Sequence, residues 1–197
     1  PHANQIKFPN AKLTYIGAAQ CEKCHKSEDK IWKGTPHSHA LNALVNVATK
    51  PTLRNFDPEC VVCHVVGLRT QSGFVSVAKT PQLANVGCES CHGPGSGHAA
   101  NPGDKDLLLA LSPWKTKLTD RLPKLETIKA IAAVPALDRG PLEAKLTDSQ
   151  RTAVNGVSKF CQQCHDHDND PRFNVYEYLP KILHSGFRSG GLPFNAK

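Results

Sequence analysis

CESCH, at residues 88–92, is one of four copies of the same five-residue pattern. The other copies are CEKCH at 21–25, CVVCH at 60–64 and CQQCH at 161–165. Cys-x-x-Cys-His is the attachment signature of a c-type haem, in which two thiols bond to one porphyrin and the adjacent histidine becomes the proximal iron ligand. All eight cysteines of the chain lie in these four patterns. The sequence therefore predicts four covalently attached haem c groups containing iron.

This interpretation assigns a role to every motif cysteine and histidine. The predicted haem-binding cysteines are Cys21, Cys24, Cys60, Cys63, Cys88, Cys91, Cys161 and Cys164, and the predicted proximal ligands are His25, His64, His92 and His165. Two alternatives are zinc held by four thiolates and pairs of redox-active or disulfide-bonded cysteines. Both leave the histidine after every second cysteine unexplained. No catalytic residue is assigned.

The composition fits a small chain folded around large cofactors. A length of 197 residues allows one or at most two domains. The chain is 39% hydrophobic but only 6% aromatic, and it has 14 Gly and 15 Pro. We expect a mainly α fold with much loop and few or no strands, in which the chain wraps a stacked haem array. The prediction is a single tetrahaem domain over 1–197, with an extended N-terminal arm (1–20), motifs one to three (21–100), a helical scaffold (101–160) and a loop-rich tail after the fourth motif (161–197).

Local patterns predict several elements in the first half of the chain. Residues 27–32 are expected to be helical, and an amphipathic helix over 40–48 could be capped by Thr35 or Ser38. The β-favouring residues in SGFVSVAKTP, at 72–81, predict a short hairpin.

The second half is expected to be mostly helical. Residues 107–111 form a short apolar helix or strand, and 118–134 has helical spacing with a kink at Pro123. A further helix begins near Thr147, takes Asp148 as its N-cap and leads to Cys161.

The formal charge of +7 does not indicate a nucleic-acid partner. The lysines are dispersed, and the haem propionates would offset much of the positive charge. No apolar stretch reaches the roughly 18 residues of a membrane span. Because haem c is attached outside the cytoplasm, and because Pro1 has the appearance of a processed N-terminus, we expect a secreted protein whose signal peptide has been removed. Its place would be extracellular, on the outer cell surface or in the periplasm.

The distal iron ligands have to be histidines, because the chain has no methionine. Six histidines lie outside the motifs: His2, His37, His39, His98, His167 and His184. A glycine-rich turn brings His98 within reach of an iron, while either His37 or His39 is expected to be a ligand. His184 is a further candidate and His2 could reach any iron, whereas His167 is expected at the surface. Saturated bis-histidine irons would leave no site for a substrate, which favours electron transfer.

Three stretches of the chain carry a resemblance: CEKCHKSEDKIWKGTPHSH (21–39), the block from CVVCH to GPGSGH (60–98) and the late CQQCH. They resemble the tetrahaem cytochrome c family that accepts electrons from hydroxylamine oxidoreductase. The resemblance covers about the first hundred residues, and VGCESCHGPG is its most specific part. It implies haems stacked in parallel and perpendicular pairs. It also implies that His37 serves the iron of His165, that His98 serves the iron of His25, and that a late histidine, His184 or His167, serves the third.

In that family the second haem is five-coordinate, whereas this chain has spare histidines that could close the iron at His64. The chain also resembles the extracellular tetrahaem cytochromes that form conductive filaments, of the outer-membrane c-type cytochrome E type. There one ligand comes from the neighbouring subunit, and His2 is the candidate here. We therefore expect electron transfer by a filament subunit, with other copies of itself and redox proteins or extracellular acceptors as partners. The alternatives are a periplasmic shuttle, or an enzyme with an open iron at His64 acting on a small nitrogen or oxygen species.

Overall fold

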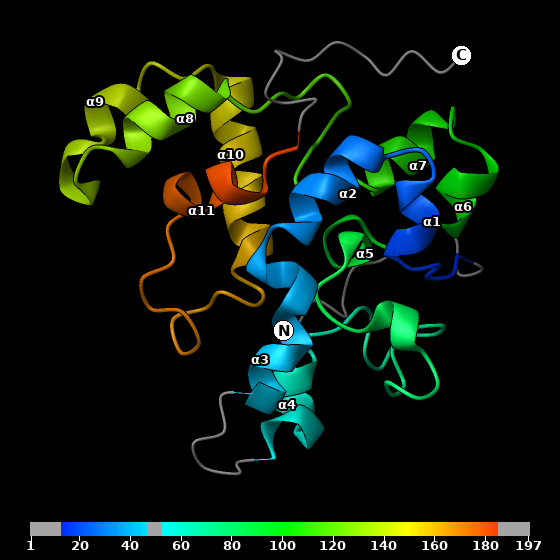
Figure 1. Ribbon diagram of the computed structural model, residues 1–197. Coiled ribbons are helices and arrows are strands. Elements are labelled where there is room, and N and C mark those ends of the chain that lie inside the picture. The colour runs from blue at the N-terminus through cyan, green and yellow to red at the C-terminus, as the bar shows by residue number, and fades with distance from the viewer. Residues whose placement is uncertain (1–12, 47–52, 185–197) are drawn as a thin grey trace. The chain divides into compact units, whose positions relative to one another are not determined.

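The computed structural model describes residues 13–46 and 53–184. Within these ranges the chain is helical, with turns and loops between short helices (Figure 1). The described residues contain no strand, and one isolated antiparallel bridge joins Val65 to Ala84. The prediction of a mainly α fold with much loop is confirmed. His2 and residues 47–48 of the predicted helix over 40–48 lie outside the described residues.

The chain divides into two compact units, Pro1–Pro113 and Trp114–Lys197, which are described separately below. The first unit holds three motifs and the second holds one. The helices of the first unit are α1 (Ala18–Glu22), α2 (Lys26–Lys33), α3 (Ala40–Asn46), α4 (Pro58–Val61), α5 (Cys88–His92), α6 (Ser96–Ala100) and α7 (Lys105–Ala110), with 3-10 turns at Pro36–His39, Arg54–Phe56 and Pro81–Leu83. The second unit contains α8 (Leu125–Ala132), α9 (Gly140–Glu143), α10 (Asp148–Cys161) and α11 (Val175–Ile182), with a 3-10 turn at Ala136–Asp138. The predicted single domain stays a prediction.

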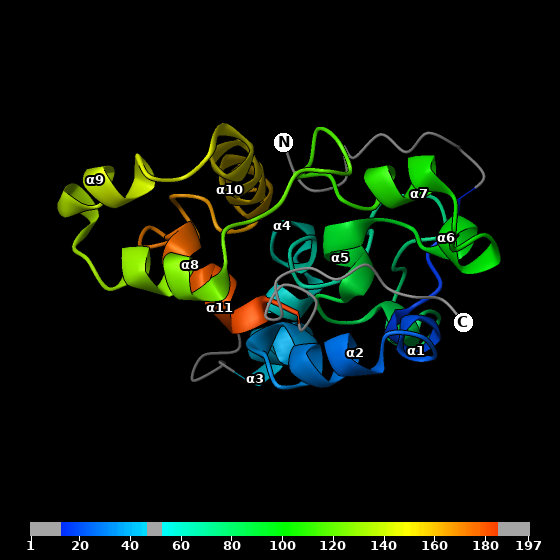
Figure 2. The same cartoon turned by 90° about the horizontal axis from the view of Figure 1, so that it is seen from above.

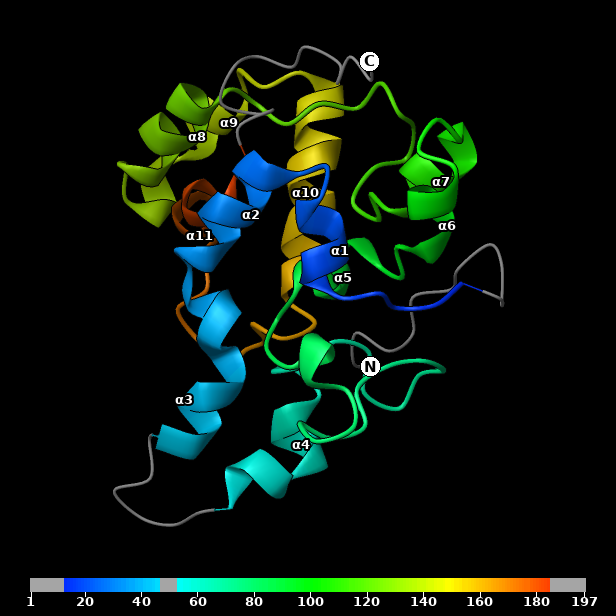
Figure 3. The same ribbon diagram turned by 45° about the vertical axis from the view of Figure 1, so that its right-hand side comes forward.

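The helices of the first unit are too short to be stable in isolation, so they depend on tertiary contacts. Helix α1 contacts α5, and α3 lies beside α4 (Figure 3). A small apolar core forms between these elements and the loop that follows motif two. Its buried members are Leu41, Val61, Val65, Val66, Phe74 and Leu83.

The predicted hairpin over 72–81 is wrong. The amides of Lys79 and Thr80 donate to the carbonyl of Ser76, at 3.1 and 2.8 Å, and close a turn where a second strand would have to run. The amide of Val75 donates to the hydroxyl of Thr80 at 2.9 Å. Val75 and Val77 remain 61% and 58% exposed. Because strand propensity reflects packing on a pleated surface, it has no effect here, where no neighbouring strand is present.

Neither predicted cap of the helix at 40–46 forms. The hydroxyl of Thr35 donates to the carbonyl of Trp32 at 2.7 Å, and that of Ser38 donates to the carbonyl of Thr35 at 2.8 Å. Both hydroxyls therefore hold the turn between α2 and the 3-10 segment rather than the start of α3. The predicted helix over 27–32 is confirmed by α2.

Pro123 lies before helix α8 and does not kink it. The carboxylate of Asp120 accepts hydrogen bonds from the amides of Thr116 and Lys117, at 2.9 and 3.0 Å, and makes a turn of residues 116–120. A proline also disfavours helical geometry in the residue before it. The helix therefore begins at Leu125, and the expected helix over 118–134 is correct only over 125–132. Upstream, residues 107–110 are helical in α7, where Asp104 caps the first turn.

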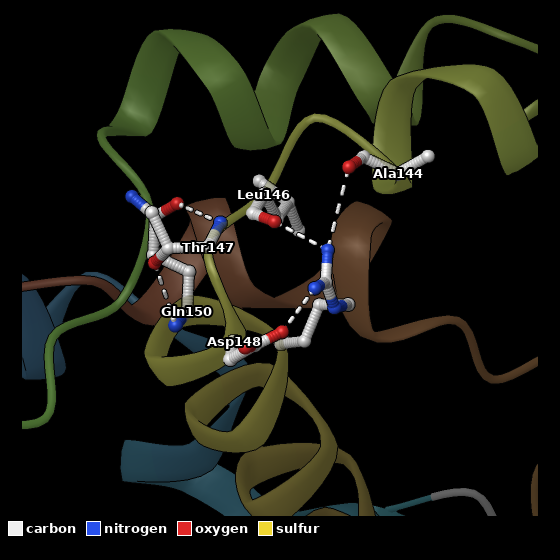
Figure 4. A network of polar contacts seen from close by, with 6 residues as sticks. Ala144, Leu146, Thr147, Asp148 and Gln150 are labelled. Atoms are coloured by element: carbon white, nitrogen blue, oxygen red, sulfur yellow. Dashed lines mark hydrogen bonds and ion pairs between the residues drawn. The ribbon is translucent and has the colours of Figure 1, made fainter.

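The N-cap of helix α10 is Thr147, not Asp148 as predicted, and Asp148 is the first residue of the helix. The Thr147 hydroxyl accepts from the amide of Gln150, while the Gln150 side chain accepts from the amide of Thr147 (Figure 4). This reciprocal capping box satisfies two amides that the helix leaves unbonded. Asp148 instead pairs with the guanidinium of Arg151. The helix then runs for 14 residues and ends at Cys161, as expected.

The second unit has an apolar core of its own, in which α11 packs against α8 (Figure 2). The guanidinium of Arg139 is 4% exposed and joins the two helices. It donates to the carbonyl of Val134 at 2.8 Å and to the carboxylate of Glu177 at 2.8 Å. The described part of the tail after motif four contains the eight-residue helix α11, which is capped by Asn174 and was not predicted. The buried members of this core are Leu122, Ile128, Ile131, Leu146, Ala153, Val154, Val157, Val175, Tyr176, Leu179 and Leu183.

Candidate haem sites

Each Cys-x-x-Cys-His motif forms a turn of helix. The amide of His25 donates to the carbonyl of Cys21 at 2.9 Å, and the amide of His165 donates to that of Cys161 at 2.9 Å. Motif three lies wholly within α5, and motif two closes through a 2.9 Å bond from the amide of His64 to the carbonyl of Val61. Residues three and four apart on a helix lie on the same side. The two sulfurs and the imidazole of a motif therefore face one direction, as attachment to one haem requires.

Three proximal histidines use their Nδ1 atoms in hydrogen bonds. Nδ1 of His64 lies 2.5 Å from the carbonyl oxygen of Ala40, and Nδ1 of His92 lies 2.7 Å from that of Leu111. Nδ1 of His165 lies 2.9 Å from the carboxylate of Asp170. Since these oxygens only accept, Nδ1 carries the proton and Nε2 keeps its lone pair for a metal. Metal-bound histidines in proteins are held in this way, so the residues present fit haem iron.

The imidazole of His165 is enclosed by two aromatic rings. Phe173 stacks on it with ring centroids 5.2 Å apart and an interplanar angle of 22°, and Tyr178 meets it edge-on at 5.4 Å. The hydroxyl of Tyr178 donates to the second oxygen of Asp170 at 3.3 Å. Burial of Asp170 opposes its ionisation, but the hydrogen bonds from His165 and Tyr178 outweigh it and lower the pKa of the carboxyl. A cavity of about 330 Å³ lies beside this group and is also lined by the exposed His167.

His98 lies opposite the proximal histidine of motif one. The ring centroids of His25 and His98 are 6.1 Å apart, with an interplanar angle of 33°. Burial, followed by repulsion from His25, lowers the pKa of His98, so its imidazole is neutral at pH 7. Nδ1 of His98 is buried and has no hydrogen-bond partner within residues 13–46 and 53–184.

A buried carboxylate inside motif three holds the two loops that carry these histidines. Glu89 is 4% exposed and accepts hydrogen bonds from the amides of Ile16, Gly17 and Gly95 at 2.7 to 3.0 Å. Burial raises the pKa of Glu89, and the hydrogen bonds from these amides offset only part of the rise. Gly93 adopts a φ of 81° directly after α5, which lets the chain turn back toward His98. Glu89 was not among the predicted site residues, although its position before a run of glycines, whose amides can donate to a carboxylate, is a signal in the sequence.

The first cysteines of motifs one and three are in contact. An interaction with the Cys88 thiol, together with burial, raises the pKa of the Cys21 thiol. All eight cysteines are described and none forms a disulfide. Within the described ranges, no three His, Cys, Asp or Glu side chains converge as a metal cage.

An apolar hollow of about 690 Å³ lies against helix α4 of motif two. It is lined by Leu41, Val61 and Phe74, together with the exposed side chains of Phe56, Val75 and Val77. Exposed apolar side chains around one hollow are unusual in a small protein and mark a surface that another group covers. The hollow therefore fits an apolar body such as a porphyrin.

The remaining distal candidates are less defined by geometry. His37 is half-buried and His39 is exposed in the 3-10 turn before α3, and His184 follows α11 in a half-buried position. Which iron each of them serves stays a prediction.

Four Cys-x-x-Cys-His turns, three of which have the Nδ1 of the histidine bound to an acceptor, define the class, which is a c-type cytochrome. Its cofactors are four covalently attached haem c groups. The described residues include no helix that is long and apolar enough to cross a membrane.

Comparison with known proteins gives a more particular similarity. Residues 20–93 match the family described as cytochrome c554 and c-prime. The chain is 35% identical over 95 residues to cytochrome c-554 of Nitrosomonas europaea. This match covers 43% of this chain and 40% of that protein, so it spans less than half of the relative's length. No solved structure matches. The resemblance to the tetrahaem cytochrome c family is confirmed over motifs one to three, and motif four lies beyond the residues that this family matches.

Proposed function

We propose that this protein is an electron carrier and not an enzyme, with four haem c groups each held by two axial histidines. The facing imidazoles of His25 and His98, with ring centroids 6.1 Å apart, are the observation that carries the proposal. The thiols of Cys21 and Cys88 also interact. Each sulfur is the attachment point of a different haem, so the points at which the first and third haems join the chain are adjacent. Electron tunnelling weakens exponentially with the distance between cofactor edges, and adjacent attachment favours rapid transfer.

Two histidines on one iron are supported best at motif one. Imidazole nitrogens bind metals at about 2 Å, so two imidazoles on opposite sides of one iron have centroids about 6 Å apart. The 6.1 Å separation of the His25 and His98 rings agrees with this value. We assign His98 as the distal ligand of the first iron. By resemblance, His37 serves the iron of His165 and His184 serves that of His92, which leaves His2 or His39 for the iron of His64.

The chain's own residues orient and tune the cofactors, while the bound haems supply the one-electron chemistry. The carbonyls of Ala40 and Leu111 fix the ring orientation of two proximal histidines. Glu89 ties the segment before motif one to the turn before His98, which keeps both imidazoles in place. Bis-histidine ligation without methionine implies low reduction potentials.

The test of this proposal is a haem count combined with a ligation assay. A pyridine haemochrome spectrum should give four haems per chain. Electron paramagnetic resonance should show low-spin ferric iron, and the reduced protein should not bind carbon monoxide. Replacing His98 by Ala should convert one haem to the high-spin form, while His167→Ala should convert none. A high-spin iron in the unaltered protein, first to be sought at His64, would instead favour an enzyme acting on a small nitrogen or oxygen species.

We further propose that the protein is secreted and that copies join head to tail in an extracellular filament. Support comes from the resemblance to filament-forming cytochromes and from the six histidines outside the motifs, of which His2 would be donated to the neighbouring subunit. A head-to-tail contact that does not close on itself produces a filament. Electron cryo-microscopy of native secreted material should show filaments. Dispersed monomers would favour a periplasmic shuttle that passes electrons to partner proteins. A His2→Ala variant that still assembles with every haem low-spin would overturn the assignment of His2 as the donated ligand.

A further inference from the structure

The hydrogen-bond acceptors of the proximal histidines differ in charge. His64 and His92 each face a neutral backbone carbonyl, whereas His165 faces the carboxylate of Asp170. The distances are similar, at 2.5, 2.7 and 2.9 Å. The three imidazoles therefore present the same nitrogen to iron but are polarised to different extents.

The contact between His165 and Asp170 is built into the local fold. The amide of Asp170 donates to the carbonyl of Asp166 at 2.8 Å, and the amide of Phe173 donates to the carbonyl of Asp170 at 3.0 Å. These bonds fix the turn that brings the carboxylate of Asp170 back to the imidazole of His165, five residues earlier in the chain. The stacked ring of Phe173 and the edge-on ring of Tyr178 then hold the imidazole. The side chains of His165 and Asp170 are only 29% and 21% exposed, so solvent screens the pair incompletely.

A carboxylate acceptor changes what the imidazole gives to a metal. It draws the Nδ1 proton more strongly than a carbonyl does, which raises the basicity of Nε2. A stronger donor stabilises ferric iron more than ferrous iron, since the ferric ion carries the additional positive charge. Hydrogen bonding behind the axial ligand is one of the few means by which a protein sets a haem potential.

We propose that Asp170 is a positioning residue that acts through His165 to make the haem at motif four harder to reduce than the haems at motifs two and three. The inference rests on the haem ligation proposed above. It predicts that electrons entering the protein reside on the iron of His64 or His92 before that of His165. A one-electron carrier with such a gradient has a preferred direction of transfer.

The test is a spectroelectrochemical titration of the four-haem protein with Asp170→Asn. The amide keeps the shape and an acceptor oxygen but removes the charge. The midpoint potential of one haem should become more positive by about 59 mV. For a one-electron couple, this shift corresponds to a tenfold change in the ratio of reduced to oxidised iron. Haem methyl resonances followed by NMR through the same titration should assign this midpoint to the fourth haem. Asp168→Asn is the matched control, because Asp168 lies exposed in the same loop and no hydrogen bond joins its carboxylate to a histidine in the described structure.

A second variant separates electronic tuning from loss of packing. Tyr178→Phe keeps the ring against His165 but removes the hydroxyl that donates to Asp170, so the carboxylate becomes a stronger acceptor. The same midpoint should then move slightly negative, opposite to the shift in Asp170→Asn. Shifts of the same sign, an equal shift in Asp168→Asn, or no shift in Asp170→Asn would each overturn the inference. If the unaltered protein contains four reversibly reducible haems, such a result leaves the electron-carrier proposal intact. Fewer than four haems would overturn both.

Discussion

Residues 13–113 and 114–184 differ in what holds them together. The first region carries three haem motifs, and none of its helices exceeds eight residues. Its buried apolar cluster has six members among the described residues, compared with eleven in the second region. The second region carries one motif at the end of a 14-residue helix. The comparison indicates that the protein supplies its own core where haems are few and relies on the cofactors where they are many.

The largest expected effect comes from removing the haems. A chain expressed without haem attachment should lose most of its amide protection over residues 13–113, because the apolar surfaces around the motifs would be left in water. Helices α8, α10 and α11 should retain slow exchange. Hydrogen exchange followed by mass spectrometry measures both regions in one sample. Equal protection in the two regions would contradict the comparison.

Glu89 tests whether polar contacts replace core packing in the first region. Glu89→Gln would leave amides of Ile16, Gly17 or Gly95 without a charged acceptor, and a buried group of this kind costs about 3 kcal/mol when its partner is lost. Thermal unfolding of the holoprotein should show this loss, and the reduced variant should begin to bind carbon monoxide as His98 loosens. Glu59→Gln is the control, because Glu59 is exposed and its carboxylate lies 3.8 Å from the guanidinium of Arg69. A stable variant with unchanged haem spectra would show that Glu89 does not hold His98.

The packing of the second region can be tested at a glycine. A Cβ atom at Gly156 in α10 would clash with the backbone oxygen of Trp114, which cannot move without displacing the chain. Gly156→Ala should therefore destabilise the protein by about 1–3 kcal/mol despite the better helix propensity of alanine. Gly140→Ala in α9 meets nothing within 4 Å and should be neutral or stabilising by about 0.5 kcal/mol. Chemical denaturation monitored by circular dichroism measures both values.

The capping box of α10 should have a smaller effect. Thr147→Ala removes the hydroxyl that accepts from Gln150, and we expect a loss of about 1 kcal/mol. Exchange should increase first in the initial turn of the helix. Thr152→Ala, on the exposed side of the same helix, should change stability by less than about 0.5 kcal/mol. A larger loss at Thr152 than at Thr147 would contradict the cap.

Protonation of Asp120 should lower the stability of the protein only at acidic pH. Hydrogen bonds from Thr116, Lys117 and Ser149 outweigh burial and lower the pKa of Asp120 from 3.8 to about 2. The unfolded chain therefore binds this proton more readily, and the stabilising contribution is present above pH 4 and lost as the pH falls toward 2. Asp120→Asn should flatten that part of the stability profile. An unchanged slope between pH 4 and 2 would exclude Asp120 as its source.

The elements predicted correctly from the sequence were those governed by local rules. Helices α2 and α10 form where they were predicted, and α10 ends at Cys161 as expected. The predicted hairpin failed because Val75 and Val77 had β propensity but no neighbouring strand. The predicted cap at Asp148 failed by one residue, because Thr147 can exchange two hydrogen bonds with Gln150 whereas Asp148 is adjacent to Arg151 in space.

The sequence by itself determined the cofactor chemistry of this protein. Four Cys-x-x-Cys-His motifs that use every cysteine specify four haems, since attachment depends only on residues within one helical turn. The absence of methionine excluded His/Met ligation and left histidine as the predicted distal ligand. Tertiary structure decided which groups surround each imidazole. His98 faces His25, Glu89 ties two loops and Asp170 polarises His165, because these contacts depend on how the chain turns and packs around each motif.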